Sequence, residues 1–105
     1  MIDKKTAVFR KWFDSLKENI QDKIEIYIGR LLSGNFSGCR SVGNGISELV
    51  IDFQKGYRIY YIILNNKEIL LLLAGGTKGG NQKQQQKDIA LATEIRDYLK
   101  REGVI

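Results

Sequence analysis

Three apolar runs follow one another between residues 46 and 74, and only short turns separate them. The runs cover residues 46–53, 57–64 and 68–74, and the turns contain Gln54-Lys55-Gly56 and Asn65-Asn66. Strands joined by turns this short pair as antiparallel hairpins, because a parallel connection needs a dozen or more residues. The pattern therefore predicts an antiparallel meander of three strands.

The alternation of residue types assigns the two faces of these strands. Leu49, Ile51 and Phe53 share one face of the first run, and Glu48, Val50 and Asp52 share the other. Residues 68–74 are apolar on both faces, which is typical of a strand that is covered on both sides.

Helical patterns flank the meander. A short start at residues 1–5 could form a strand, and Thr6 then suits the N-cap of a first helix. Asn19 is predicted to cap a second helix, which Gly34 would end at the C′ position. The apolar stripes of these two helices are Val8, Phe9, Trp12, Phe13 and Leu16, then Ile20, Ile24, Ile28, Leu31 and Leu32. Their very short link predicts a helical hairpin.

The C-terminal third is expected to close the fold. Residues 75–80 are predicted to form a flexible glycine-rich loop, and Asn81–Lys87 a polar loop or helix start. Asp88 favours a helix N-terminus, and the last apolar stripe is Leu91, Ile95, Tyr98 and Leu99. The order of elements predicts an α+β fold in which residues 1–105 form one domain.

Composition excludes several classes of site. The 105 residues include no His and one Cys, so a Ser-His-Asp triad, a Cys-His dyad and His-ligated zinc are impossible. Catalysis would have to use Lys, Arg, Tyr, Asp or Glu, and no metal or cofactor is expected. No signal peptide or membrane-spanning run is found, so we expect a cytoplasmic protein with no membrane partner.

The positive charge is concentrated in one part of the chain. The net charge is +5, and residues 55–87 contain six cations and a single anion. The net charge of the remaining residues is zero. This asymmetry indicates a polyanion partner, although scattered surface lysines would also produce it.

Arg58 lies on a strand that is otherwise apolar, and an unpaired buried charge is expensive. Two interpretations stay open: an ion pair with Glu48 or Asp52 on the neighbouring strand, or a phosphate clamp. The glycine-rich loop could bring Lys78 to the same end of the sheet. Aromatic and cationic side chains together suit RNA, which makes a set of residues candidates for RNA binding. The set is Lys55, Tyr60, Tyr61, Lys83 and Lys87.

A group of short motifs carries a family resemblance. They are Gly45-Ile46-Ser47-Glu48-Leu49, Gly56-Tyr57-Arg58-Ile59-Tyr60-Tyr61, Leu72-Leu73-Ala74-Gly75-Gly76-Thr77-Lys78 and Lys87-Asp88-Ile89-Ala90. With these motifs the chain resembles the RelE/ParE toxin superfamily over essentially its whole length, in the branch of addiction-module killer proteins often called HigB-like. The resemblance implies two helices packed on a twisted antiparallel sheet, with a C-terminal helix.

The same resemblance implies a function. It implies the toxin of a type II toxin–antitoxin pair, with an antitoxin that often carries a helix-turn-helix domain. RelE-type members enter the ribosome and cleave mRNA. By matching motif, Arg58 corresponds to a phosphate-contacting arginine, and Lys78 falls where the family places another active-site cation. The general base for the ribose 2′-OH is left open among Glu48, Asp52 and a lysine.

Two other functions are alternatives to the endoribonuclease. ParE-type members bind DNA gyrase and inhibit it without catalysis. A degenerate member could persist as a module that binds only RNA or an antitoxin. Cleaved transcripts, DNA damage and absence of toxicity would distinguish the three.

Overall fold

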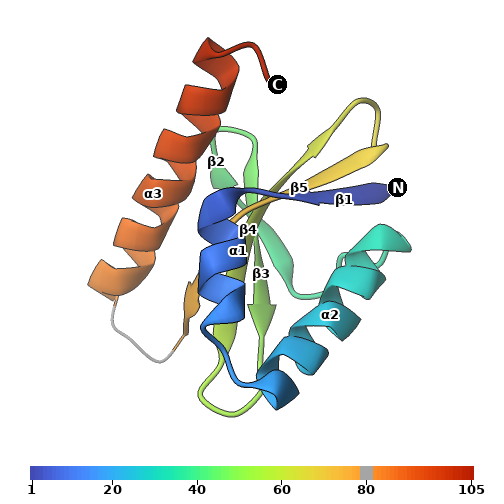
Figure 1. Cartoon of the computed structure of the whole chain (residues 1–105), viewed down its shortest axis with the longest axis vertical. Coiled ribbons are helices and arrows are strands. Elements are labelled where there is room, and N and C mark those ends of the chain that lie inside the picture. Colours follow the sequence, from blue (N-terminus) through green and yellow to red (C-terminus); the bar gives the residue numbers. More distant parts are fainter. Residues whose placement is uncertain (79–81) are drawn as a thin grey trace.

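The computed structural model describes residues 1–78 and 82–105 as a five-stranded sheet with three helices. The elements run in the order β1 (Ile2–Lys5), α1 (Ala7–Asp14), α2 (Glu18–Leu32), β2 (Cys39–Gly43), β3 (Ile46–Ile51), β4 (Tyr57–Leu64), β5 (Ile69–Thr77) and α3 (Gln82–Arg101). Figure 1 shows α1, α2 and α3 around the twisted sheet. The predicted α+β class, with a helical hairpin and a closing helix, is confirmed.

The predicted meander forms the centre of the sheet, whose strand order is β1-β5-β4-β3-β2. Strands β2 to β5 pair antiparallel in sequence. The N-terminal strand β1 was also predicted, and it adds to the edge of β5 in parallel. The parallel pairing follows from the long connection through both helices and the meander, which lets the chain return in the same direction.

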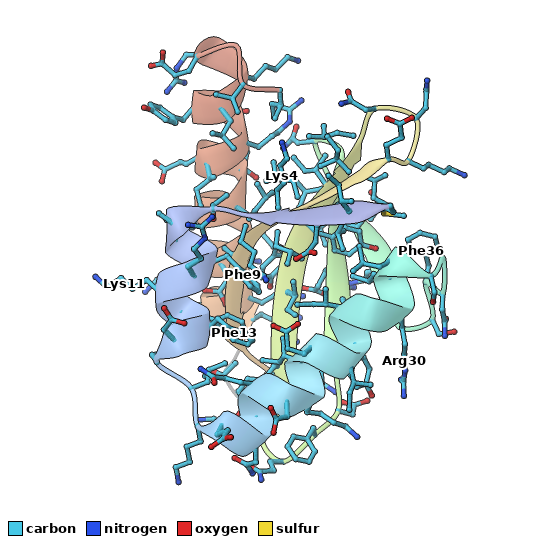
Figure 2. The ribbon with its side chains drawn as sticks, turned by 45° about the vertical axis from the view of Figure 1, so that its right-hand side comes forward. Lys4, Phe9, Lys11, Phe13, Arg30 and Phe36 are labelled. Carbon is cyan, nitrogen blue, oxygen red and sulfur yellow. The ribbon has the colours of Figure 1, made fainter. Side chains whose placement is uncertain are left out.

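The helices cover the two faces of the sheet separately. Phe9 of α1 and Ile24 and Ile28 of α2 pack with Leu49 and Ile59 on one face. Figure 2 shows Phe9 and Phe13 turned toward the sheet while Lys11 points away from it. On the other face, α3 contributes Ala92 to a second cluster. The members of that cluster are Ile46, Tyr60, Ile62, Leu71, Leu73 and Ala92.

Local capping explains where two of the helices begin and end. The Phe9 N–H donates to the Thr6 hydroxyl over 3.0 Å, so the predicted N-cap is confirmed. Gly34 has a φ of +87° and ends α2, as predicted. The N–H groups of Gly34 and Asn35 donate to Leu31 and Arg30, which is the Schellman arrangement.

Three local predictions are wrong. The N-cap of α2 is Lys17 and not Asn19, because the helix starts at Glu18, two residues earlier than a cap at Asn19 would give. The glycine-rich segment is not a loop from residue 75, because β5 continues through Gly75 and Gly76 to Thr77. Helix α3 starts at Gln82, so Asp88 lies in its second turn rather than at its N-terminus. Gly79, Gly80 and Asn81 of these predictions lie outside the described residues.

Candidate functional site

The strand register brings three polar side chains into one row on the face that α3 covers. Arg40 of β2 pairs with Glu48 of β3, and Glu48 pairs with Tyr60 of β4. Arg58 lies two residues before Tyr60, so it shares that face. The sheet thus places two arginines on either side of one carboxylate.

Glu48 is the one polar or charged residue among those described that is fully buried, with an exposed fraction of 0%. The Arg40 Nε lies 2.9 Å from its Oε1, and the Arg58 Nε lies 3.6 Å from its Oε2. From α3, the Gln85 Nε2 donates to Oε2 over 2.9 Å. The ion pair between Arg58 and Glu48 is the first of the two interpretations of Arg58, and the structure contains it.

The surroundings of Glu48 hold it in its charged form. Burial raises the pKa of Glu48, but the hydrogen bonds from Gln85 and Arg40 and the charge of Arg40 outweigh that effect. The pKa of Glu48 is therefore below its ordinary value. A carboxylate whose oxygens are already occupied and whose pKa is lowered is a poor acceptor for a substrate proton.

A second carboxylate lies beside Arg58 on the inner side of α3. Asp88 lies against Gly76, the β5 partner of Arg58, and a Cβ at Gly76 would overlap its carboxylate. The Gln84 Nε2 donates to Asp88 Oδ1 over 3.0 Å. Burial raises the pKa of Asp88 above its ordinary value, and the nearby charge of Glu48 adds to that rise. Hydrogen bonding by Gln84 and the charge of Arg58 oppose it without cancelling it.

An exposed ion pair lies farther along the same end of the sheet. Lys78 Nζ contacts Asp52 Oδ1 just after β5 and β3 end, and the exposed side-chain fractions are 39% and 76%. The Lys78 N–H donates to the Gly56 carbonyl over 2.9 Å, which fixes this corner. The prediction that Lys78 lies at the same end of the sheet as Arg58 is therefore confirmed. Lys55 is exposed in the turn before β4 at this same end.

The other candidates for RNA binding are placed differently. Tyr60 and Tyr61 are 0% and 2% exposed, and their rings pack in the cores on opposite faces of the sheet. Neither ring offers a face to a base in this structure. Burial raises the pKa of both hydroxyls, and the nearby Glu48 charge raises that of Tyr60 further. Lys83 and Lys87 are exposed on the first turns of α3.

Sequence reasoning missed three residues of the polar cluster around Glu48 and Arg58. It named neither Arg40 nor Gln85, and it did not identify Asp88 as a neighbour of Arg58. Arg40 needs β2, whose residues Cys39–Gly43 lack an apolar run. One signal could have revealed this strand: a hairpin around the Gly43-Asn44-Gly45 turn places the positively charged Arg40 opposite the negatively charged Glu48. Gln85 and Asp88 reach the sheet only through the docking of α3, and no local pattern predicts that docking.

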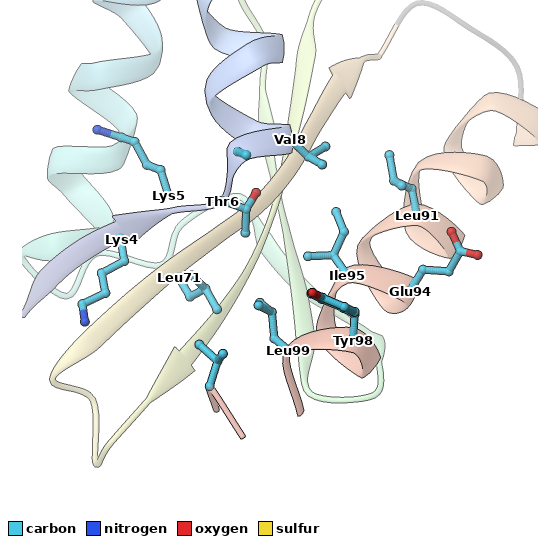
Figure 3. A pocket seen from close by; sticks show the side chains of 12 residues that line it. Lys4, Lys5, Thr6, Val8, Leu71, Leu91, Glu94, Ile95, Tyr98 and Leu99 are labelled. Atoms are coloured by element: carbon cyan, nitrogen blue, oxygen red, sulfur yellow. The ribbon is translucent and has the colours of Figure 1, made fainter. Parts of the chain in front are cut away.

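A separate hollow lies elsewhere, between β1, the start of α1 and α3 (Figure 3). It encloses about 530 Å³ and is lined mainly by apolar side chains. Lys4 and Lys5 lie on one side of it and Glu94 on the other, as Figure 3 shows. Its apolar lining distinguishes it from the polar cluster around Glu48. Among the described residues, no group of three or more His, Cys, Asp and Glu side chains could hold a metal ion.

Comparison with known families and sequences finds a family and a relative that resemble this chain. The model of the family described as Phage derived protein Gp49-like (DUF891) matches residues 11–97. An uncharacterized protein from Haemophilus influenzae is 45% identical over 58 residues, which are 54% of this chain and 59% of that protein. The chain therefore matches less than two thirds of the length of that relative.

Solved structures with the same fold include those of the E. coli toxin RelE. A mutant of RelE in the free state has a TM-score of 0.68 at 13% identity, over 88% of this chain and 93% of that one. RelE in the intact RelBE toxin–antitoxin complex has a TM-score of 0.62 at 12% identity, over 71% and 93%. At this identity the likeness establishes the fold, and the predicted RelE-like architecture is confirmed. Within the described part of the chain, no helix is long and apolar enough to cross a membrane.

Proposed function

The chain belongs to the Phage derived protein Gp49-like (DUF891) family, and we propose that it is the toxin of a type II toxin–antitoxin pair. We propose further that it is a ribosome-dependent endoribonuclease that cleaves mRNA in the cytoplasm and so inhibits translation. The RelE-like fold supports the toxin role. One observation carries the ribonuclease role: the accessible Asp52–Lys78 pair stands beside Arg58 at one end of the sheet.

The proposed reaction uses these three side chains. Arg58 stabilises the scissile phosphate with its guanidinium, a geometry suited to phosphate oxygens. Asp52 accepts the proton of the ribose 2′-OH, and the 2′-oxygen attacks phosphorus while the bond to the 5′-oxygen breaks. Lys78 stabilises the charge of the transition state and donates a proton to the leaving oxygen. The products are a 2′,3′-cyclic phosphate and a 5′-hydroxyl.

The distances along the strands are compatible with this assignment. Arg58 pairs with Val50, and Asp52 lies two residues farther along the chain, just past the end of β3. Two residues of a strand span roughly 7 Å, a separation that a nucleotide linkage can bridge. Asp52 is more accessible than the saturated Glu48, and this supports its selection as the base.

A cognate antitoxin is part of the proposal. RelE was solved with its antitoxin in the RelBE complex, and the present chain shares that fold. The proposed antitoxin is of the helix-turn-helix type, and the proposed branch of the toxin superfamily is the HigB-like one. Co-purification of this chain with the product of a small adjacent gene tests the pairing.

Inducible expression followed by sequencing of transcript 5′ ends tests the activity. We expect new, codon-phased ends, and we expect Asp52→Asn and Lys78→Ala each to reduce them about a hundredfold. Both residues are exposed on the surface, so neither substitution should unfold the chain. Lys67→Ala is the matched control, since Lys67 is an exposed cation in the turn at the opposite end of β4.

Other outcomes would select the alternatives. Growth arrest with intact mRNA and induction of the DNA-damage response would replace the nuclease with a gyrase inhibitor. Absence of toxicity, with RNA or antitoxin binding retained, would indicate a binding module without catalysis.

A further inference from the structure

Glu48 holds two guanidinium groups that come from the strands on either side of it. Its Oε1 accepts from Arg40 of β2, and its Oε2 faces Arg58 of β4. Gln85 ties the same carboxylate to α3. One negative charge between two positive ones offsets the repulsion that would otherwise push the two arginines apart.

The two arginines differ in exposure. The side chain of Arg58 is 15% exposed, whereas that of Arg40 is 62% exposed. The Arg40 Nε–H is fixed on Glu48, and its two terminal nitrogens have no hydrogen-bond or ion-pair partner within residues 1–78 and 82–105. The tether therefore orients a guanidinium whose free edge faces solvent.

We propose that Arg40 is a second phosphate-binding residue, and that Glu48 is a positioning residue which holds Arg40 next to Arg58 as a clamp on the RNA backbone. This inference rests on the proposed function for its substrate, single-stranded RNA. A guanidinium that is already oriented loses less conformational freedom when it binds a phosphate than an untethered one does. The free edge of Arg40 can form two parallel hydrogen bonds to phosphate oxygens.

This arrangement gives Glu48 a role other than that of the general base. A base would have to release its hydrogen bonds to Arg40 and Gln85 before it could take a proton. A positioning residue keeps those bonds throughout. The two roles therefore differ in the kinetic constant that a substitution changes.

Two measurements on the full chain test the clamp. The first is the binding of a fluorescent, fully 2′-O-methylated RNA hexamer, which cannot be cleaved through its 2′-OH, at low salt. We expect Arg40→Ala to weaken binding roughly ten- to a hundredfold, as the loss of a charge-assisted bidentate contact does. Arg40→Lys should restore only part of the lost RNA affinity, because lysine keeps the positive charge but lacks the planar guanidinium that forms two parallel hydrogen bonds. Lys67→Ala is again the matched control and should bind like the wild type.

The second measurement is single-turnover cleavage on ribosomes that carry an mRNA. We expect Arg40→Ala and Glu48→Gln to raise the toxin concentration needed for the half-maximal rate and to leave the maximal rate within about threefold. Circular dichroism and the Nε–H signal of Arg40 in an NMR spectrum report whether each variant is folded and whether the tether persists. The double variant, Arg40→Ala with Glu48→Gln, leaves no buried carboxylate without its arginine. It is used in place of either single variant if that variant fails to fold.

Each outcome decides between the two proposals. Unchanged RNA binding by Arg40→Ala, with cleavage by the wild type intact, overturns the clamp alone. RNA binding that depends on Arg40 without any cleavage overturns the nuclease and supports the clamp. A wild-type chain that neither binds the hexamer nor cleaves mRNA on ribosomes overturns both, and cleavage on ribosomes without any binding of the hexamer overturns the clamp alone. Loss of the maximal rate in Glu48→Gln, with RNA binding unchanged, makes Glu48 the base and overturns its positioning role.

Discussion

At the scale of the residue, Glu48 is the one fully buried charged group among the described residues. Its pKa is lower in the folded chain than in the unfolded one, where an ordinary Glu titrates near pH 4.3. The interactions of Glu48 therefore stabilise the fold fully above about pH 4.3, and that stability is lost as the pH falls through the lowered pKa. Acid should thus unfold the chain partly by protonating this one group.

Glu48→Gln tests that effect directly. We expect the free energy of unfolding at pH 7 to fall by about 2–4 kcal/mol, because the partly buried Arg58 and the tethered Arg40 lose their charged partner. The difference between variant and wild type should shrink as the pH falls below about 4. Urea titrations between pH 3 and pH 7 measure both quantities. A difference that stays constant over this range would show that the charge of Glu48 is not the cause.

Sequence reasoning reaches part of this cluster. The lone arginine in an apolar strand predicts a carboxylate on the next strand, and Glu48, a diagonal neighbour of Arg58 across the β3–β4 pair, is that carboxylate. The exposed position of Arg40 hides its contact, because an arginine in a polar segment needs no partner to explain it. Tyr60 and Tyr61 show the opposite error: neighbouring residues of a strand face opposite sides, so both cannot belong to one surface.

At the scale of the element, the two glycines that look like a loop are part of β5. Gly75 faces α1 and Gly76 faces α3, and a Cβ at either position would overlap Trp12 or Asp88. The glycines thus let helices approach both faces of one strand. A sequence pattern cannot separate this use of Gly-Gly from a flexible loop, because the two differ only in what packs against the backbone.

Gly75→Ala should destabilise the fold by about 1–3 kcal/mol, because the indole ring of Trp12 must move to make room for the methyl group. Gly29→Ala is the control, since Gly29 lies in α2 with open space around it and should stabilise that helix by up to about 1 kcal/mol. Thermal unfolding of both variants measures the contrast. Equal midpoints for Gly75→Ala and the wild type would mean that the close approach of Trp12 is not present in solution.

The remaining elements were predictable to different degrees. Both helices of the hairpin and the central strands follow from periodicity, because each has an apolar stripe or run of its own. Strand β2 and the first turn of α3 lack such a run. Strand β2 pairs with β3, and the first turn of α3 is tied to the sheet by the hydrogen bond from Gln85 to Glu48. Tertiary contacts of this kind are invisible in a local pattern.

At the scale of the whole molecule, the positively charged third of the chain is divided between two ends of the sheet. Lys55 lies in the turn before β4, together with Lys78 and Arg58 nearby. Lys67 lies in the turn after β4, and the eight residues of this strand separate the two turns by roughly 26 Å. The excess positive charge is therefore not gathered in a single patch. The cations at the two ends of the sheet should contribute differently to the binding of a polyanion.

The salt dependence of RNA binding measures that difference. Each phosphate of a single strand that a cation neutralises contributes roughly −0.7 to the slope of log K against log salt concentration. If RNA lies along the Arg58 end of the sheet, Lys55→Ala should make this slope less steep by about that amount and weaken binding several-fold at low salt. Lys67→Ala removes the same charge from an equally exposed turn and should leave the slope unchanged. Equal effects of the two substitutions would mean that RNA responds only to the net charge of the molecule, because a bound strand at one end cannot contact both lysines. Unequal effects would locate the nucleic acid on the end of the sheet where Asp52, Lys78 and Arg58 meet.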